Sequence, residues 1–217
     1  MLEKQTIGDS AYEQIKYDII HLNFAPGEKL SEASLSRRYN VSRAPIRVAL
    51  GRLKEDGLID IRPQSGSIVC PISIERAVSI VDVRLLLEPY AVRQALPHLS
   101  DEDILRIEKL FHRLDQMEPG STERSLFISE VDIELHGLIH KRSGNPIIPE
   151  IINRYAGEIQ RIRRANIEWK NRMTPSEQEM RHIFAALKER NVDASCEAMR
   201  IHLLNIRDAL LHLPAQS

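Results

Sequence analysis

The chain has 217 residues, of which 42% are hydrophobic and only nine are glycine, a composition typical of a globular, mostly helical protein. A net charge of −1 and two cysteines exclude a uniformly basic protein, a disulfide framework and a cysteine-rich metal cluster. The amino-terminal residues lack the apolar core of a signal peptide, and no apolar run approaches the roughly 18 residues of a membrane span. We therefore expect a cytoplasmic protein with reduced thiols.

The segment from Ser31 to Arg52 predicts two short helices around a tight turn. The first helix is expected from Glu32 to Tyr39, Asn40 suits a left-handed turn residue, and Val41 would fill the space between the helices. Ser42 would cap the second helix. The buried face of the second helix is predicted by apolar residues at helical spacing, namely Ile46, Ala49, Leu50 and Leu53.

Positive charge is concentrated in this segment, although residues 1–70 together carry ten basic and nine acidic groups. Between positions 37 and 54 there are six basic residues and no acidic one: Arg37, Arg38, Arg43, Arg47, Arg52 and Lys54. Arg43 and Arg47 lie one turn apart on a face without apolar neighbours, as a helix in the DNA major groove requires for phosphate and guanine contacts. A solvated helix face usually mixes charges of both signs. The pattern favours DNA reading over the alternative of a helical hairpin that serves only as scaffold.

Two short strands are predicted after Gly57, from Leu58 to Arg62 and from Ser67 to Cys70, because both segments are rich in β-branched residues. A β-hairpin next to a helix-turn-helix is a wing. Its tip, Ser65-Gly66, is small enough to approach the minor groove or a phosphate through its backbone.

Beyond a join at residues 71–73, the pattern predicts a helical bundle and no strand of any length. Six helices are expected near residues 74–96, 101–117, 123–142, 145–170, 175–189 and 192–213, with breaks at Pro97, Pro119-Gly120, Ser143-Gly144 and Thr174-Pro175. The fold class is therefore mostly α, with an amino-terminal winged helix-turn-helix domain (1–74) and a carboxy-terminal all-α bundle (75–217).

Residues with metal-binding chemistry lie in the bundle. Asp132 and His136 are four residues apart, so both side chains leave one face of a helix. His182 and His202 lie on two later helices among apolar residues and are expected to face the core, where an unpaired imidazole is costly. Three imidazoles and a carboxylate suit Zn²⁺, Ni²⁺ or another borderline divalent ion. Periodicity leaves two alternatives open: hydrogen-bonded core histidines without metal, and His140, one turn beyond His136, as a ligand.

Arg84 lies among apolar positions of the first bundle helix, and a buried arginine needs an anion. Glu88, four residues further on, is one candidate partner. The other is the carboxylate of a small organic acid, and one guanidinium can satisfy both in turn.

Two other classes of function compete with a regulator. A helical di-metal enzyme needs two Glu-x-x-His pairs, and only Glu179 to His182 has that form. A helical mononuclear metalloenzyme needs a free general base, for which Glu179 is the local candidate. The histidines of the bundle disfavour a DNA-architectural protein that has no effector.

Residues 12–70 resemble the winged helix-turn-helix of the GntR family of bacterial transcription regulators, through the phrases PGEKLSE, LSRRYNVSRAPIRVALGRL and EDGLIDIRPQSGSIV. The resemblance implies that Arg43 and Arg47 are recognition-helix contacts and that Gly66 is a wing contact. Ala33 stands where the family often has arginine, so a contact is lost there or taken over by Arg37 or Arg38. The DNA-binding set is expected to be Arg37, Arg38, Ser42, Arg43, Ala44, Arg47, Ser65 and Gly66.

Residues 75–217 resemble the FCD ligand-binding domain of the FadR-like subfamily, through DVRLLLEPYAV, the Asp-x-x-x-His pair and Asn145-Pro146. The metal ligands implied by the resemblance are Asp132, His136, His182 and His202, with His140 outside the set. It also implies that a small organic acid binds this metal, and Arg84 is the residue that we expect to contact it. The function expected is that of a homodimeric regulator, a repressor rather than an activator, that binds a palindromic DNA operator.

Overall fold

The computed structural model describes residues 6–62, 66–165 and 172–213, and the chain separates into two compact units. The first unit holds residues 1–73 together with Arg154–Ala165, and the second holds residues 74–153 and 166–215. The mostly helical fold class is confirmed, with one small sheet in the first unit.

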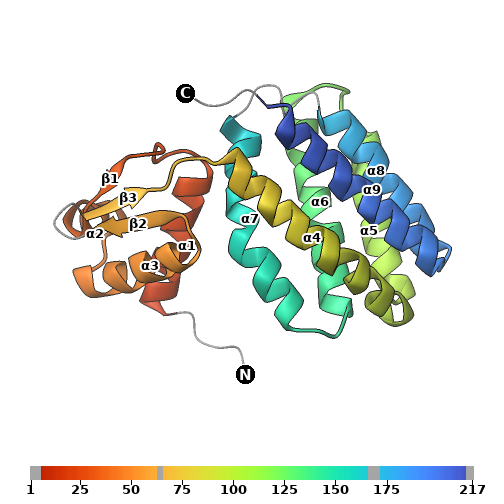
Figure 1. The fold of residues 1–217 in the computed structure, drawn as a ribbon, viewed down its shortest axis with the longest axis horizontal. Coiled ribbons are helices and arrows are strands. Elements are labelled where there is room, and N and C mark those ends of the chain that lie inside the picture. Colours follow the sequence, from red (N-terminus) through yellow and green to blue (C-terminus); the bar gives the residue numbers. More distant parts are fainter. Residues whose placement is uncertain (1–5, 63–65, 166–171, 214–217) are drawn as a thin grey trace. The chain divides into compact units, whose positions relative to one another are not determined.

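Residues 6–73 of the first unit form three helices and the sheet (Figure 1), and Arg154–Ala165, the second part of a helix from the bundle segment, belongs to the same unit. Helix α1 (Ile7–Ile20) begins with a capping box, in which Thr6 Oγ1 accepts from the backbone N–H of Asp9 at 3.1 Å. Helix α2 (Glu32–Tyr39) has the predicted bounds, and Asn40 adopts the left-handed conformation with φ 53°. Helix α3 (Arg43–Glu55) has Ser42 at its N-cap position, but the Ser42 side chain makes no capping hydrogen bond, contrary to the prediction.

The predicted wing is present as strands β2 (Ile59–Arg62) and β3 (Gly66–Val69), which pair antiparallel. A third strand, β1 (Lys29–Leu30), pairs with the other edge of β3 and gives the order β1-β3-β2. The prediction missed β1 because two residues carry no periodic signal. Gly66 opens β3 with φ +82°, a conformation that glycine adopts without strain.

The core of this unit lies between the three helices and the sheet. The face predicted for α3 is buried, and Val41 packs against the same cluster. Helices α1, α2 and α3 contribute six side chains that are at most 1% exposed, namely Ile15, Ile19, Leu35, Ile46, Ala49 and Leu53. Leu58 and Val69 of the same cluster are equally buried. This core holds α3 so that its other face, with Arg43 and Arg47, remains exposed.

All six predicted bundle helices are present. They are α4 (Ile74–Ala95), α5 (Asp101–Asp115), α6 (Thr122–Arg142), α7 (Ile147–Ala165), α8 (Met173–Lys188) and α9 (Val192–Leu211), with a 3-10 turn η1 (Leu96–His98) after α4. Helices α4 and α9 lie side by side (Figure 1). Thr174-Pro175 does not precede α8 but lies in its first turn, where the missing N–H of proline costs no helical hydrogen bond. No helix in the described segments is long and apolar enough to cross a membrane.

Candidate metal centre and DNA-binding surface

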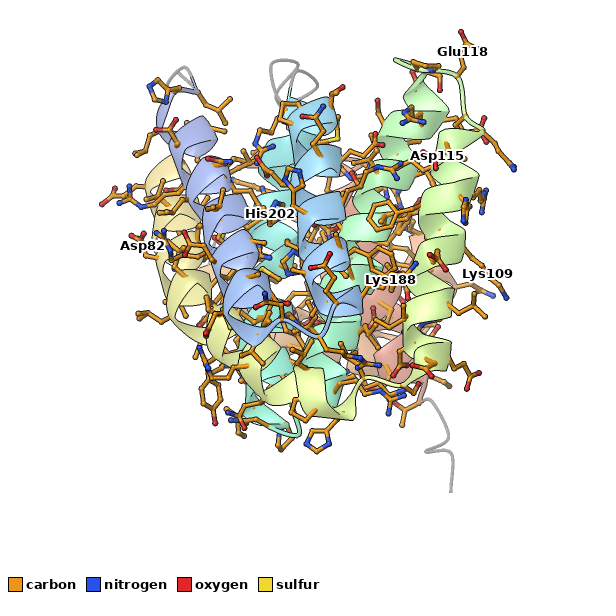
Figure 2. All side chains as sticks on the ribbon, turned by 90° about the vertical axis from the view of Figure 1, so that its right-hand side faces the viewer. Asp82, Lys109, Asp115, Glu118, Lys188 and His202 are labelled. Carbon is orange, nitrogen blue, oxygen red and sulfur yellow. The ribbon has the colours of Figure 1, made fainter. Side chains whose placement is uncertain are left out.

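Helices α6 and α9 bring one carboxylate and two imidazoles together inside the bundle. Asp132 and His136 lie one turn apart on α6. His202 comes from α9 (Figure 2). The Nε2 atom of His136 lies 3.6 Å from Asp132 Oδ1, and the Nε2 atom of His202 lies 3.3 Å from the same oxygen. All three side chains are buried, and each offers a ligand atom within 4.8 Å of the others.

The two inward nitrogens are the clearest sign that this cluster fits a metal ion. Neither His136 Nε2 nor His202 Nε2 has a hydrogen-bond partner in the described part of the chain, and both are buried. A buried polar atom left without a partner costs about 1–3 kcal/mol. A divalent cation bound by both nitrogens and by Asp132 would remove this cost, and the donor set suits Zn²⁺ or Ni²⁺.

Each imidazole is held by a glutamate at its other nitrogen. His202 Nδ1 lies 2.8 Å from Glu179 Oε2 on α8, and His136 Nδ1 contacts Glu88 Oε2 on α4. A carboxylate that accepts Nδ1–H fixes the tautomer in which the lone pair of Nε2 faces the metal position. Sequence reasoning offered Glu88 as a partner of Arg84 and Glu179 as a general base. It missed their contacts with the histidines, because only the tertiary fold brings them together.

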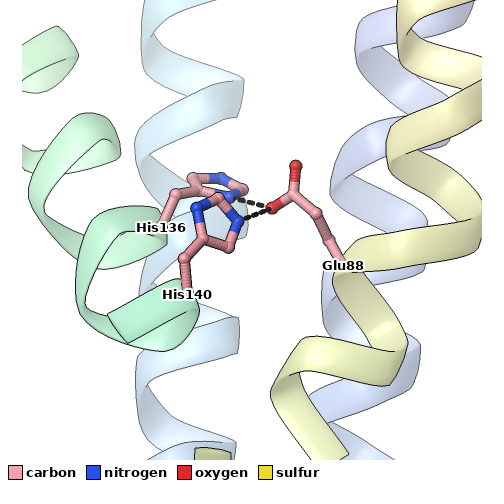
Figure 3. Close-up of side chains that lie close together, drawn as sticks. All are labelled: Glu88, His136 and His140. Atoms are coloured by element: carbon pink, nitrogen blue, oxygen red, sulfur yellow. Dashed lines mark hydrogen bonds and ion pairs between the residues drawn. The ribbon is translucent and has the colours of Figure 1, made fainter. Parts of the chain in front are cut away.

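Glu88 is fully buried and contacts three side chains. It accepts from Arg84 Nε. It also accepts from His136 Nδ1, and its Oε2 lies 3.3 Å from His140 Nε2 (Figure 3). Burial raises the pKa of Glu88, but the charges of Arg84 and His136 outweigh it and hold that pKa well below the usual range. His140 is also buried, and it is hydrogen-bonded to the carboxylate that orients His136.

In the metal-free protein at neutral pH, His136 is an imidazolium cation, protonated on both ring nitrogens. Burial lowers its pKa, but the negative charges of Glu88 and Asp132 raise it to about 9. A metal ion that binds Nε2 must therefore displace this proton. Glu88, His136 and His140 also lie within ligand distance of one another, but the Arg84 guanidinium on the same carboxylate makes that position unfavourable for a cation.

Arg84 is buried and has the intramolecular partner that the sequence offered. Its Nε donates to Glu88, and its Nη2 lies 3.5 Å from His136 Nδ1. Burial lowers the pKa of Arg84, but the carboxylates of Glu88 and Asp132 raise it above its usual value. A permanent positive charge thus lies at the edge of the candidate metal centre.

The structure does not bring His182 to the cluster. His182 is exposed on α8, whose buried face is formed by residues at helical spacing, namely Met180, Ile183, Phe184 and Leu187. At about 100° per residue, His182 lies roughly 200° around the helix from Met180. The expectation of an inward His182 came from its apolar sequence neighbours, and successive helix positions face different directions.

On the first unit, Arg37 and Arg43 are exposed and form no ion pair with the other described residues. Arg47 is exposed too, but Nε and Nη2 donate to the two carboxylate oxygens of Glu32 at 2.8 and 2.9 Å. Arg38 Nη2 donates to Asp18 at 2.8 Å, and its guanidinium lies 4.6 Å from the centre of the Phe24 ring. Arg38 therefore stabilises the fold by linking α2 to Asp18 and Phe24.

The remaining predicted DNA contacts lie at the start of α3 and in the wing. Ser42 and Ala44 are exposed beside Arg43, and Gly66 is exposed at the start of β3. Ser65 lies outside the described residues. The exposed start of α3 leaves room for a DNA backbone to approach.

Comparison with known proteins gives the family. Residues 7–69 match the model of the bacterial regulatory proteins, gntR family, and residues 79–205 match the FCD domain model. The HTH-type transcriptional repressor RspR of Escherichia coli K12 is 30% identical over 211 residues, which cover 95% of this chain and 90% of that protein. The chain belongs to the GntR family.

Other GntR-family matches extend over both units. The HTH-type regulator YdhC of Bacillus subtilis is 26% identical over 202 residues, which cover 93% of this chain and 90% of YdhC. The solved structure of E. coli McbR/YncC shares the fold, with a TM-score of 0.79 at 20% identity over 95% of this chain and 97% of that chain. The chain is therefore a DNA-binding transcription regulator with an FCD domain, and the metalloenzyme alternative is not supported.

Proposed function

We propose that this regulator is a homodimeric repressor that binds a palindromic operator and releases it when a small carboxylate effector binds to a metal in its FCD domain. Residues 1–74 would read DNA, and residues 75–217 would bind metal and effector. The observation that carries the proposal is the convergence of His136 Nε2 and His202 Nε2 on Asp132 Oδ1, with both nitrogens buried and without hydrogen bonds in the described chain.

The charges around this centre favour an anionic ligand once a metal is present. Two arginines and three carboxylates are in direct contact with the cluster or with its orienting residues: Arg84, Arg172, Asp132, Glu88 and Glu179. With the imidazoles neutral, as ligation requires, these groups leave one negative charge, and a divalent cation turns it into one positive charge. Bound Zn²⁺ or Ni²⁺ would supply a Lewis acid for a carboxylate oxygen.

Arg84 gives the effector a second contact. Its guanidinium already binds one carboxylate, that of Glu88, at the edge of the centre. An effector carboxylate can form a charge-assisted hydrogen bond with the same guanidinium. Arg84 would then share its donors between Glu88 and the effector.

Operator binding follows from α3 in the major groove, with Arg43 and Arg47 as base or phosphate contacts and Arg37 as a phosphate contact. The wing would bring Ser65 and Gly66 to the adjacent backbone. A dimer needs its two recognition helices one helical turn of DNA apart, about 34 Å. The effector would release DNA by binding more tightly to a dimer arrangement that breaks this spacing.

A thermal-shift screen of small organic acids on the metal-loaded full chain tests the effector part of the proposal. An effector should raise the melting temperature of the parent and leave metal-depleted protein and His202→Ala unchanged. An acid that stabilises the metal-depleted protein equally would place the effector site away from the metal.

A further inference from the structure

Glu32 on α2 lies beside an arginine that the proposed function assigns to DNA. Both of its carboxylate oxygens accept hydrogen bonds from Arg47 on α3, one from Nε and one from Nη2. We propose that Glu32 is a specificity-determining residue, which directs Arg47 to a guanine edge and keeps it from binding DNA phosphates. This inference rests on one part of the proposed function, the contact between Arg47 and DNA.

The hydrogen bonds to Glu32 occupy one edge of the Arg47 guanidinium. A guanidinium has five N–H groups in a planar fork, and the ion pair uses Nε–H and one N–H of Nη2. The second N–H of Nη2 and an N–H of Nη1 are parallel at the end of the fork. Two parallel donors match the O6 and N7 acceptors of guanine. The Arg47 side chain is 73% exposed, so this end is open to DNA.

The charge of Glu32 separates a base contact from a phosphate contact. The Arg47 hydrogen bonds hold the pKa of Glu32 below its usual value, so the carboxylate is ionised at neutral pH. A phosphate that approached Arg47 would meet this like charge at short range. Guanine O6 and N7 carry no formal charge and meet a much weaker repulsion. The ion pair therefore penalises phosphate binding more than guanine binding.

Glu32 is the better-anchored partner of the pair. Its side chain is 31% exposed, against 73% for Arg47. It lies in the first turn of α2, where the positive end of the helix dipole stabilises a carboxylate. Exposed ion pairs usually contribute little to stability, but two parallel hydrogen bonds give this pair a defined geometry. We therefore expect Glu32 to direct Arg47.

Base preference and non-specific affinity, measured on the same full-length variants, test this role. The parent selects its preferred duplex from a randomised DNA pool. Arg47→Ala then identifies the G·C pair whose replacement no longer weakens binding. Parent, Glu32→Gln and Glu32→Asp are titrated with the selected duplex, with the duplex changed at that pair, and with a duplex of scrambled sequence, each at several salt concentrations. Thermal melting checks that every variant folds.

The parent should discriminate against the changed base pair by about 5- to 150-fold. Glu32→Gln should reduce this discrimination by about threefold or more and bind the scrambled duplex more tightly. Its salt dependence should be steeper by about one ion for each recognition helix, because the released guanidinium can bind a phosphate. Glu32→Asp keeps the charge but is too short to hold both donors in place. It should lose discrimination while its salt dependence stays near that of the parent.

Two controls separate positioning from a general loss of negative charge. Glu55→Gln removes an exposed carboxylate at the end of α3 and should leave the discrimination unchanged. In the Arg47→Ala background, Glu32→Gln should have no further effect on base preference. Parent-like discrimination in Glu32→Gln, or an equal loss with and without Arg47, would overturn the role of Glu32. If Arg47→Ala kept the base preference of the parent at every pair, the proposed Arg47 base contact itself would be wrong.

Discussion

The two carboxylate oxygens of Glu32 on α2 hold the guanidinium of Arg47 on α3, at 2.8 and 2.9 Å. This pair lies on the exposed face of α3, and the Arg47 hydrogen bonds lower the pKa of Glu32. The proposed DNA contact Arg47 is therefore paired with a carboxylate in the DNA-free protein. Arg43 has no such partner among the described residues.

Arg43→Ala and Arg47→Ala should each weaken operator binding roughly 5- to 150-fold, the effect of losing one base or phosphate contact. Both side chains are exposed, so neither change should alter the melting temperature. Electrophoretic mobility shift with the DNA that flanks the gene measures the effect. Unchanged affinity and salt dependence in both variants would show that α3 is not the reading helix.

Arg38→Ala should behave differently from Arg37→Ala, although the two residues are neighbours. Arg38 bonds Asp18 and stacks on Phe24, so its loss should lower the melting temperature by a few degrees. Arg37 is exposed, and its loss should weaken binding to all DNA sequences alike. The slope of the logarithm of the binding constant against the logarithm of the salt concentration should fall by about one. If Arg38→Ala were as stable as Arg37→Ala, the bracing role of Arg38 would be wrong.

Glu179→Gln should lower metal affinity roughly 10- to 100-fold, because the amide no longer fixes the His202 tautomer as strongly. Glu197→Gln, an exposed change on α9, is the matched control and should have no effect. Competition with a chromophoric chelator measures the metal dissociation constant of each variant. If Glu179→Gln bound the metal as tightly as Glu197→Gln, Glu179 would not belong to the metal centre.

The charge on His136 should stabilise the metal-free protein below neutral pH. Its pKa is raised from 6.5 to about 9 by Glu88 and Asp132 against the effect of burial, so the stabilisation is fully present below pH 6.5 and lost as pH rises through 9. Urea unfolding of chelator-treated parent should show this loss between pH 6.5 and 9.5, and His136→Gln should not. If the free energy of unfolding of the parent fell no more steeply with pH than that of His136→Gln, the positive charge on His136 would be contradicted.

The sequence predicted what depends on local spacing. Asp132 and His136 share a face because they are four residues apart, and the six bundle helices follow from apolar periodicity and from their end signals. Apolar neighbours misled the prediction for His182, because the inward residue of that turn is Met180. Glu88 and Glu179 could not be assigned their roles, because each reaches its histidine across helices far apart in the sequence.

Operator binding with and without metal and acid is the most direct measurement of the proposed regulation. The parent and His202→Ala are titrated with operator DNA in metal-loaded and metal-depleted form, each with and without the acid that the thermal-shift screen selects. We expect the acid to weaken operator binding at least tenfold, and only in the metal-loaded parent. Release of DNA at the same acid concentration by metal-depleted parent or by His202→Ala would contradict sensing through this metal.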